Sequence, residues 1–210
     1  MNMLQLLAFI TNKRYWKLHS VLIKCALLIM GVNVGRKFYI EGVPVLKIRG
    51  KAANIVIGNN VSILGDIDLR NRENGRIVIK DDVTIEAGCR FVAAREGILQ
   101  IGSGSIVTTG AILNGGADLI IGSKCIIGPR CSINANEHVF KRNQLVREAG
   151  FIHAPVRIED DCWVAANVVI MKGVTLATGS IVGSGSVVTK DTQPYSINIG
   201  VPARKIAERE

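Results

Sequence analysis

The chain repeats an aliphatic position every six residues. In its C-terminal third the repeat is continuous, and a small or compact residue follows each of the first five aliphatic positions by four places. The aliphatic positions are Ile158, Val164, Ile170, Leu176, Val182 and Val188, and the companions are Cys162, Val168, Val174, Ser180 and Ser186. A helix has a period of 3.6 and a half-buried strand a period of two, so a fixed period of six predicts a solenoid.

The same spacing recurs upstream, where short insertions interrupt it. The upstream positions are Ile57 and Ile63; Ile79, Ile85 and Phe91; Ile101, Val107 and Leu113; and Ile121, Ile127 and Ile133. Three such hexads make one triangular turn, and stacked turns at the roughly 4.8 Å strand spacing bury one aliphatic column on each face. About six turns can be counted in this way. Parallel crossovers are normally right-handed, so physical rules alone would predict a right-handed coil.

The regular spacing stops after Ile133 and resumes only at Ile158. The insertion between them, residues 134–157, contains two of the three histidines of the chain, His138 and His153. A solenoid accepts loops only outside its coil, and such loops often carry function because a rigid scaffold holds their ends. These two histidines are therefore the candidates for chemistry.

The N-terminal segment lacks hexads. Residues 1–35 contain a dense apolar run from Val21 to Met30, which we expect to be helical. The uninterrupted part is shorter than the roughly 20 residues of a transmembrane helix, and Lys24 interrupts it. A secretory signal is disfavoured because no small-x-small cleavage motif follows cleanly before Arg36.

Two interpretations of this segment stay open. The helix either covers the open end of the coil or lies on a membrane surface. In the second case basic side chains face anionic headgroups while Trp16 and the leucines enter the acyl boundary. The basic residues concerned are Lys13, Arg14, Lys17 and Lys24.

Four of the five cysteines follow an inward aliphatic residue by four places. They are Cys89, Cys125, Cys131 and Cys162. This position predicts buried core residues, and no C-x-x-C pair or matching histidine cluster has the spacing of zinc ligands. We therefore expect structural cysteines and no metal, and unpaired thiols fit a reducing cytoplasm.

Three linked segments, residues 154–163, 182–191 and 200–204, resemble the hexapeptide-repeat acyltransferases, in particular the sugar and polysaccharide O-acetyltransferase branch. They read APVRIEDDCW, VGSGSVVTKD and GVPAR, and the resemblance extends over about residues 55–205. It implies an all-β protein whose fold is a left-handed parallel β-helix. The expected organisation is a helical segment at 1–35, a coil domain at 36–205 with an active-site loop at 134–157, and a tail at 206–210. The resemblance also implies a homotrimer that uses acetyl-CoA.

The stretch from Ile133 to His138 is similar to the place where this family carries its catalytic histidine. A neutral hydroxyl is a poor nucleophile, so a base with a pKa near 7 would accelerate acyl transfer. The resemblance thus implies His138 as general base. We expect residues that neighbour His138, or that stack near it, to contact the acceptor or position the base. We expect residues of the C-terminal turns to contact the coenzyme. The first group is Trp163, Asn114, Asn136, Glu137, Glu148 and His153; the second is Ala166, Ser184 and Thr189, with Lys190 and Arg204 on the phosphates. Asn114 should lie beneath Asn134.

The composition agrees with this interpretation. Hydrophobic residues make up 48% of the 210 residues and aromatic residues only 5%, which suits one domain with a narrow interior. The net charge of +9 comes from scattered Lys and Arg without interleaved aromatics. That pattern disfavours nucleic-acid binding and suits a phosphorylated ligand, such as coenzyme A or a lipid pyrophosphate, or an anionic membrane.

The leading hypothesis is an acetyl-CoA-dependent O-acetyltransferase that modifies a sugar hydroxyl during cell-surface polysaccharide or lipopolysaccharide assembly. It would work in the cytoplasm, free or on the inner face of the membrane, on a sugar or lipid-linked oligosaccharide. N-acetylation of a nucleotide-linked amino sugar is the close alternative. A β-helical metalloenzyme of the carbonic anhydrase type needs three converging histidines, and His19 is misplaced for that. A non-catalytic scaffold is the third class. The sequence does not specify the acceptor, the acyl length or the residue that orients His138.

Overall fold

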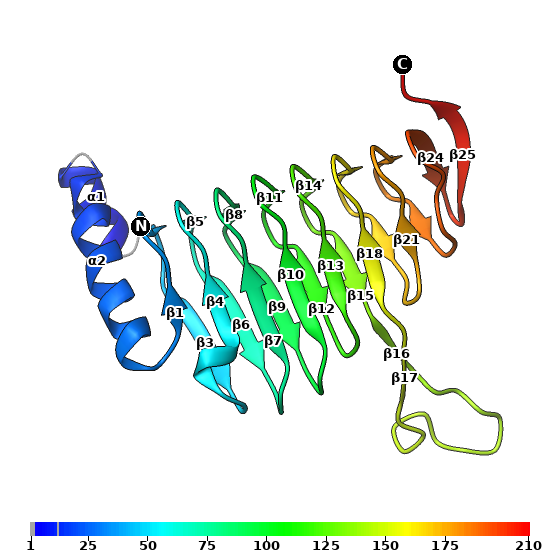
Figure 1. The fold of residues 1–210 in the computed structure, drawn as a ribbon, viewed down its shortest axis with the longest axis horizontal. Helices are drawn as coiled ribbons and strands as arrows, with labels where there is room; N and C mark the ends of the chain where they lie inside the picture. The colour runs from blue at the N-terminus through cyan, green and yellow to red at the C-terminus, as the bar shows by residue number, and fades with distance from the viewer. Residues whose placement is uncertain (1–2, 12) are drawn as a thin grey trace.

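The computed structural model describes residues 3–11 and 13–210, so the predicted N-terminal helix is tested over all but residues 1, 2 and 12. The described chain forms a triangular coil of parallel strands with two helices at its N-terminal end and one hairpin projecting from its side (Figure 1). Seven strands of each of three sheets stack along the coil, so the described residues make seven turns. The sequence spacing predicted about six.

Each sheet takes one strand from every turn. The first sheet contains β1 (Asn33–Val34), β4 (Ile55–Ile57), β7 (Arg76–Ile79), β10 (Ile98–Ile101), β13 (Leu119–Ile121), β18 (Val156–Ile158) and β21 (Thr175–Leu176). The second contains β2 (Tyr39–Ile40), β5 (Ser62–Leu64), β8 (Thr84–Glu86), β11 (Ile106–Val107), β14 (Ile126–Ile127), β19 (Trp163–Val164) and β22 (Ile181–Val182), followed by β24 (Ser196–Gly200) and β25 (Ala203–Glu208). The third contains β3 (Pro44–Ile48), β6 (Ile67–Asn71), β9 (Cys89–Ala93), β12 (Ile112–Asn114), β15 (Ser132–Asn134), β20 (Val169–Ile170) and β23 (Val187–Val188).

The predicted aliphatic columns are the core. Along the first sheet the paired inward residues are Ile57, Ile79, Ile101, Ile121, Ile158 and Leu176. The second and third sheets pair their own predicted columns in the same way, and the third adds Leu69 ahead of Phe91. All of these side chains are buried. The hexad spacing therefore gives both the fold class and the strand register correctly.

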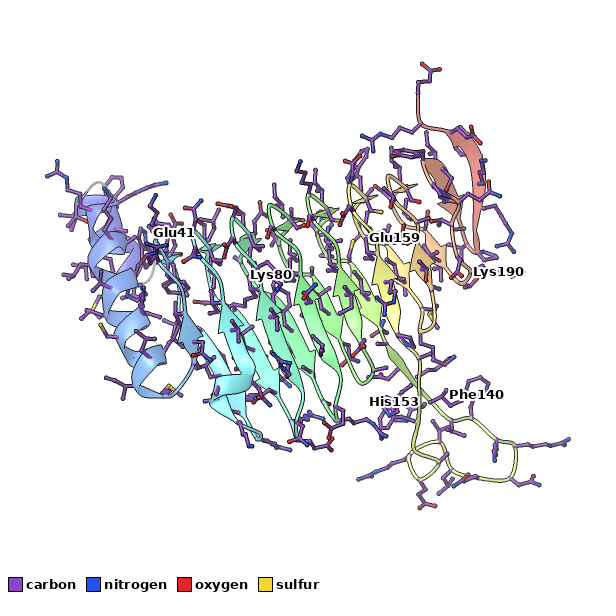
Figure 2. The ribbon with its side chains drawn as sticks, viewed as in Figure 1. Glu41, Lys80, Phe140, His153, Glu159 and Lys190 are labelled. Carbon is purple, nitrogen blue, oxygen red and sulfur yellow. The ribbon has the colours of Figure 1, made fainter. Side chains whose placement is uncertain are left out.

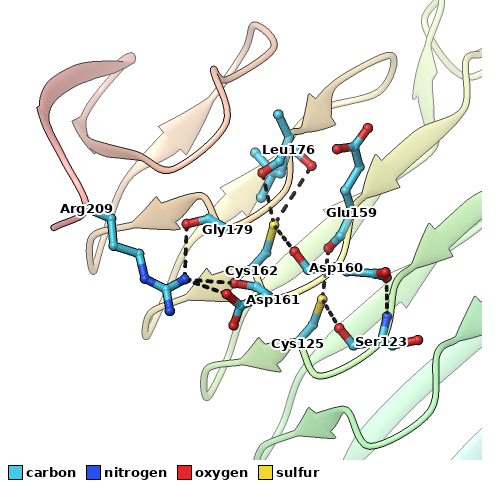
Figure 3. A network of polar contacts seen from close by, with 10 residues as sticks. Ser123, Cys125, Glu159, Asp160, Asp161, Cys162, Leu176, Gly179 and Arg209 are labelled. Atoms are coloured by element: carbon cyan, nitrogen blue, oxygen red, sulfur yellow. Dashed lines mark hydrogen bonds and ion pairs between the residues drawn. The ribbon is translucent and has the colours of Figure 1, made fainter.

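The four repeat-position cysteines are buried and unpaired, as expected. Burial raises the pKa of the Cys89 thiol to about 11, so this thiol stays protonated at neutral pH. In the fifth turn the Cys125 thiol donates to the carbonyl of Glu159 at 3.0 Å, and in the sixth turn the Cys162 thiol donates to the carbonyl of Ala177 at 3.3 Å (Figure 3). These thiols fill the core and use backbone carbonyls as partners.

The C-terminal end of the coil is closed by an antiparallel pair, β24 and β25. The predicted tail at 206–210 therefore begins inside a strand, since β25 continues to Glu208. Arg209 fastens this strand to the coil: its guanidinium lies 2.8 Å from the Asp161 carboxylate (Figure 3). Residues 206–209 are therefore bound to the coil and do not form a free tail.

The N-terminal end is covered by the second of two helices, α1 (Met3–Ile10) and α2 (Arg14–Ile29). His19 of α2 bonds through Nε2 to the carbonyl of Gly42 at 2.9 Å, and Ser20 accepts a hydrogen bond from the amide of Ile40 at 2.8 Å. The coil begins at β1, so it starts at residue 33 rather than 36. The inward face of α2 therefore packs on the first turn of the coil.

Two details of the membrane interpretation need correction. Trp16 does not point outward, because only 6% of its surface is exposed and its ring packs edge-on against His19. The Lys24 ammonium donates to the carbonyl of Gly35 at 2.6 Å and is half-buried, so it faces the coil. Both side chains serve the contact between helix and coil.

Candidate functional site

The insertion at 134–157 forms a β-hairpin that leaves the coil between β15 and β18 (Figure 1). Its strands are β16 (Asn136–His138) and β17 (Phe151–His153), and they pair antiparallel. Asn136 lies opposite His153, and His138 lies opposite Phe151. Directly opposed residues project to the same side of a strand pair, so these four side chains share one face.

Aromatic rings line that face. His138 is exposed, and its ring centroid lies 4.1 Å from that of Phe151. Phe151 is in turn 6.1 Å from His153, at the root of the hairpin. Figure 2 shows His153 on the side of the hairpin that faces the N-terminal turns, with Phe140 on the other side. The predicted base is thus presented to solvent beside an aromatic wall.

His153 is held at the junction of hairpin and coil. Its Nδ1 is buried and has no hydrogen-bond partner among the described residues. A Cβ on Gly116 would lie 2.5 Å from this nitrogen, so the glycine is what allows the ring to approach the coil. Burial lowers the pKa of His153, the nearby Arg95 lowers it further, and Glu73 opposes them. Burial and Arg95 therefore both favour the neutral form of this imidazole, and its Nδ1 is enclosed against the coil.

Two adjoining pockets meet at this histidine, with volumes of about 540 and 350 Å³. They share Glu73, Arg95, Gly116 and His153. These residues lie at the corner between the third and first sheets, which we call the hairpin corner; it comprises residues 72–75, 94–97, 115–118 and 135–155. Because corners of successive turns stack, distant segments of the sequence form one surface.

Asn136 belongs to this corner, and Asn114 lies next to it at the end of β12. The register places Asn114 directly beneath Asn134, as predicted. Its amide, however, donates to Asn136 Oδ1 at 3.4 Å, and both amides line the smaller pocket with Phe151. The structure therefore brings three predicted acceptor-side residues together, namely Asn114, Asn136 and His153.

Two other predicted acceptor residues are placed differently. The Glu137 carboxylate lies 2.8 Å from the ammonium of Lys172, which follows β20, and Glu137 lies on the hairpin face opposite His138. This ion pair fixes the hairpin to the next turn, so Glu137 positions the hairpin. Glu148 is exposed in the loop beyond the strands, where its amide bonds to the carbonyl of Leu145. Contact between Glu148 and an acceptor stays a prediction.

Trp163 lies on a different part of the coil. It is in the second sheet, between Ile126 and Ile181, and 49% of its surface is exposed, as its outward position predicted. The hairpin leaves from the opposite corner of the triangle, between the third and first sheets, so it does not cover Trp163. Within one chain, Trp163 and His138 do not form a single site.

The predicted coenzyme residues fall along the last turns. Ala166 and Ser184 lie at stacked corners, where the amide of Gly185 donates to the carbonyl of Ala166 at 2.9 Å. Thr189 is exposed just after β23. Lys190 and Arg204 line one pocket of about 260 Å³. Asp191 and Lys205 line the same pocket, and the contact of Lys190 and Arg204 with coenzyme phosphates stays a prediction.

The hairpin corner contains residues that were not predicted, chiefly Arg72, Glu73, Arg95 and Phe151. The signal that could have found the first three is the stacking of the β6 and β9 ends, where Asn71 pairs with Ala93. Following that register one step further places Arg72–Glu73 beside Ala94–Arg95. Phe151 could be found only from the hairpin pairing.

The three histidines do not converge, since His19 lies in α2 at the far end of the coil. Among residues 3–11 and 13–210, no group of three His, Cys, Asp or Glu side chains is arranged to hold a metal ion. Within the same ranges, no helix has both the length and the apolarity needed to cross a bilayer.

The lowered pKa of His153 predicts an acid-sensitive stability. The unfolded chain takes up the proton near the ordinary histidine pKa of about 6.5, whereas the folded chain resists it to lower pH. Stability contributed by neutral His153 is therefore complete above that value and is lost as the pH falls through the lowered folded pKa. We expect His153→Gln to reduce the fall in Tm between about pH 7.5 and about pH 5. Thermal melts of both proteins across this range measure it, and parallel falls would contradict the assignment.

Parts of this chain are similar to known proteins. The bacterial transferase hexapeptide family, defined by six repeats, matches residues 155–190. The matched segment contains the strands of the coil from β18 to β23. A Schizosaccharomyces pombe protein named "Putative acetyltransferase" is 41% identical over 56 residues, and the aligned segment is 27% of each chain. The chain thus spans only about a quarter of that curated relative.

Solved hexapeptide-repeat structures extend the likeness. A hexapeptide-repeat-containing acetyltransferase of Vibrio cholerae O1 biovar eltor, solved with acetyl coenzyme A, is 33% identical with a TM-score of 0.50, covering 53% of this chain and 61% of that one. The polySia-specific acetyltransferase NeuO is 24% identical with a TM-score of 0.58, and 85% of each chain is covered. The second likeness concerns the fold alone. The fold of this chain is the left-handed β-helix of these acetyltransferases.

Proposed function

We propose that this protein is an acetyl-CoA-dependent acetyltransferase that acts on a sugar hydroxyl, with His138 as general base. The observation that carries the proposal is the exposed imidazole of His138 on a hairpin of the coil. This imidazole packs against Phe151, which lines a pocket with Asn114 and Asn136. The likeness to a structure solved with acetyl coenzyme A supports the donor. Cell-surface polysaccharide or lipopolysaccharide assembly is the process we assign to it.

In the proposed reaction, the His138 imidazole takes the proton of the acceptor hydroxyl as that oxygen attacks the thioester carbonyl. The tetrahedral intermediate then collapses, the carbon–sulfur bond breaks, and the imidazolium returns its proton to the departing thiolate. Lys190 and Arg204 would hold coenzyme phosphates, because paired cations suit a phosphorylated ligand. An amine acceptor would need the same base, so an amino sugar on a nucleotide carrier is the alternative substrate.

We further propose that the site is completed in a homotrimer. Trp163 and His138 belong to different parts of the triangular section, so a neighbouring chain must supply one of them if both contact the acceptor. Ala166 and Ser184 are small residues on the same coil edge, which would let the coenzyme arm approach the backbone between two chains. The unpaired thiols suit a reducing compartment, and we place the enzyme in the cytoplasm.

The test is acceptor-dependent release of free thiol from acetyl-CoA. Purified protein would be offered free, nucleotide-linked and lipid-linked sugars, with the matching amino sugars in parallel. We expect release with a hydroxyl acceptor, catalysed by a species that light scattering shows to contain three chains. Release only with amino sugars would change the proposal to N-acetylation. An absence of both release and acetyl-CoA binding would exclude the transferase function.

A further inference from the structure

The outer face of α2 is apolar. The helix turns Trp16, Ser20 and Leu27 toward the coil, and on the opposite side it exposes Leu18, Leu22 and Ile29. Leu22 is 61% exposed and Ile29 is 87% exposed. Residues four or seven apart lie on one face of a helix, so these side chains form a stripe. A helix that covers the coil end needs one apolar face, and α2 has two.

The preceding helix also exposes apolar side chains. Met3, Phe9 and Ile10 of α1 are all exposed, although each is large and apolar. Contiguous exposed apolar patches on a soluble surface mark binding sites more often than isolated residues do. We call the stripe formed by Leu18, Leu22 and Ile29 the end-cap surface.

The helical segment that carries this surface is basic. Residues 1–40 contain six Lys and Arg and no Asp or Glu, so they supply six of the nine net positive charges of the chain. Lys13, Arg14 and Lys17 are exposed at the junction of the two helices and along the flank of the stripe. An apolar stripe with basic flanks is the pattern of a helix that lies in a bilayer interface.

We infer that the end-cap surface docks on an anionic bilayer, with its apolar side chains at the acyl boundary and Lys13, Arg14 and Lys17 among the headgroups. A second copy of the chain is a poorer occupant, because two such surfaces face to face would bring like charges together. Anionic headgroups neutralise the same cations. This inference goes beyond the proposed acetyl transfer and does not depend on it.

Vesicle flotation of the full chain tests the inference. The vesicles would be phosphatidylcholine alone or phosphatidylcholine with an equal part of phosphatidylglycerol. We expect binding to the anionic vesicles that weakens with salt. The double substitution Leu22→Glu with Ile29→Glu should lower the partition coefficient by about tenfold or more, since it places charge in the apolar stripe. Ile206→Glu is the matched control, because Ile206 is 62% exposed at the other end of the coil, and it should bind like the wild type.

A probe on Cys25 supplies a measurement that needs no glutamate variant. Cys25 lies in α2 and is the exposed cysteine, while the other four are buried. An environment-sensitive dye on this thiol should shift to shorter wavelength with anionic vesicles. An unshifted dye together with no flotation would overturn the inference. Equal binding to neutral vesicles would overturn its electrostatic part, and a concentration-dependent dimer abolished by the double substitution would assign the surface to a second copy instead.

Discussion

Replacing His138 with alanine should lower acceptor-dependent acetyl transfer by roughly a hundredfold to ten-thousandfold, the range that general bases contribute. The loss should appear in kcat, because the base acts as the hydroxyl attacks and has little part in ground-state binding. His138 is exposed on the hairpin, so the substitution should leave the fold intact. Thiol release under saturating acetyl-CoA measures the effect, with a thermal melt to confirm folding.

The matched control is His153→Ala, the same substitution on the same hairpin face. His153 lines both corner pockets, so its loss should act mainly on the KM for the acceptor. If His153→Ala abolished kcat while His138→Ala left it unchanged, the base would be His153. We include this control because the Nδ1 of His153 is buried and has no hydrogen-bond partner among the described residues.

Replacing Phe91 with alanine should lower the free energy of unfolding by about 3–5 kcal/mol. Phe91 is fully buried in the third sheet, stacked between Leu69 and Leu113. The stacked turns hold their backbones at a fixed spacing, so the cavity cannot collapse easily. Denaturant unfolding followed by circular dichroism measures the loss.

Phe140→Ala is the control for that prediction, because Phe140 is exposed on the hairpin loop. It should change the free energy of unfolding by no more than about 0.5 kcal/mol. Similar losses for the two variants would mean that the interior column does not dominate stability. The two variants make the same Phe→Ala change, once in the buried core and once on the exposed loop.

The fold was predictable because each inward position is specified by the sequence itself. The spacing gives the strand register from Ile57 to Val188 without reference to distant contacts. The first turn was missed although Val34, Ile40 and Leu46 keep the six-residue spacing. The apolar helix that ends at Ile29 precedes that turn directly, so the two apolar patterns run together in the sequence.

The site was predictable in location but less so in detail. The break in spacing after Ile133 locates the hairpin, and the stacking of Asn114 beneath Asn134 follows from the same spacing. Which side chains share a hairpin face depends on the pairing of β16 with β17, and hence on where the loop turns. The ion pair of Glu137 with Lys172 depends on the same strand pairing. The sequence therefore could not give the shared hairpin face or this ion pair.

The coil also fixes the distance between the N-terminal helices and the hairpin. The helices cover the first turn, and the hairpin leaves after the fifth, so four strand spacings, about 19 Å, separate them along the axis. If the end-cap surface lies on a bilayer, the stacked turns act as a rigid ruler that holds His138 well above the headgroups. Such an enzyme would pass over the membrane-proximal sugars of a lipid-linked chain and modify those that extend to the fifth turn. The number of turns between the helices and the hairpin would then determine which sugar of the polysaccharide is acetylated.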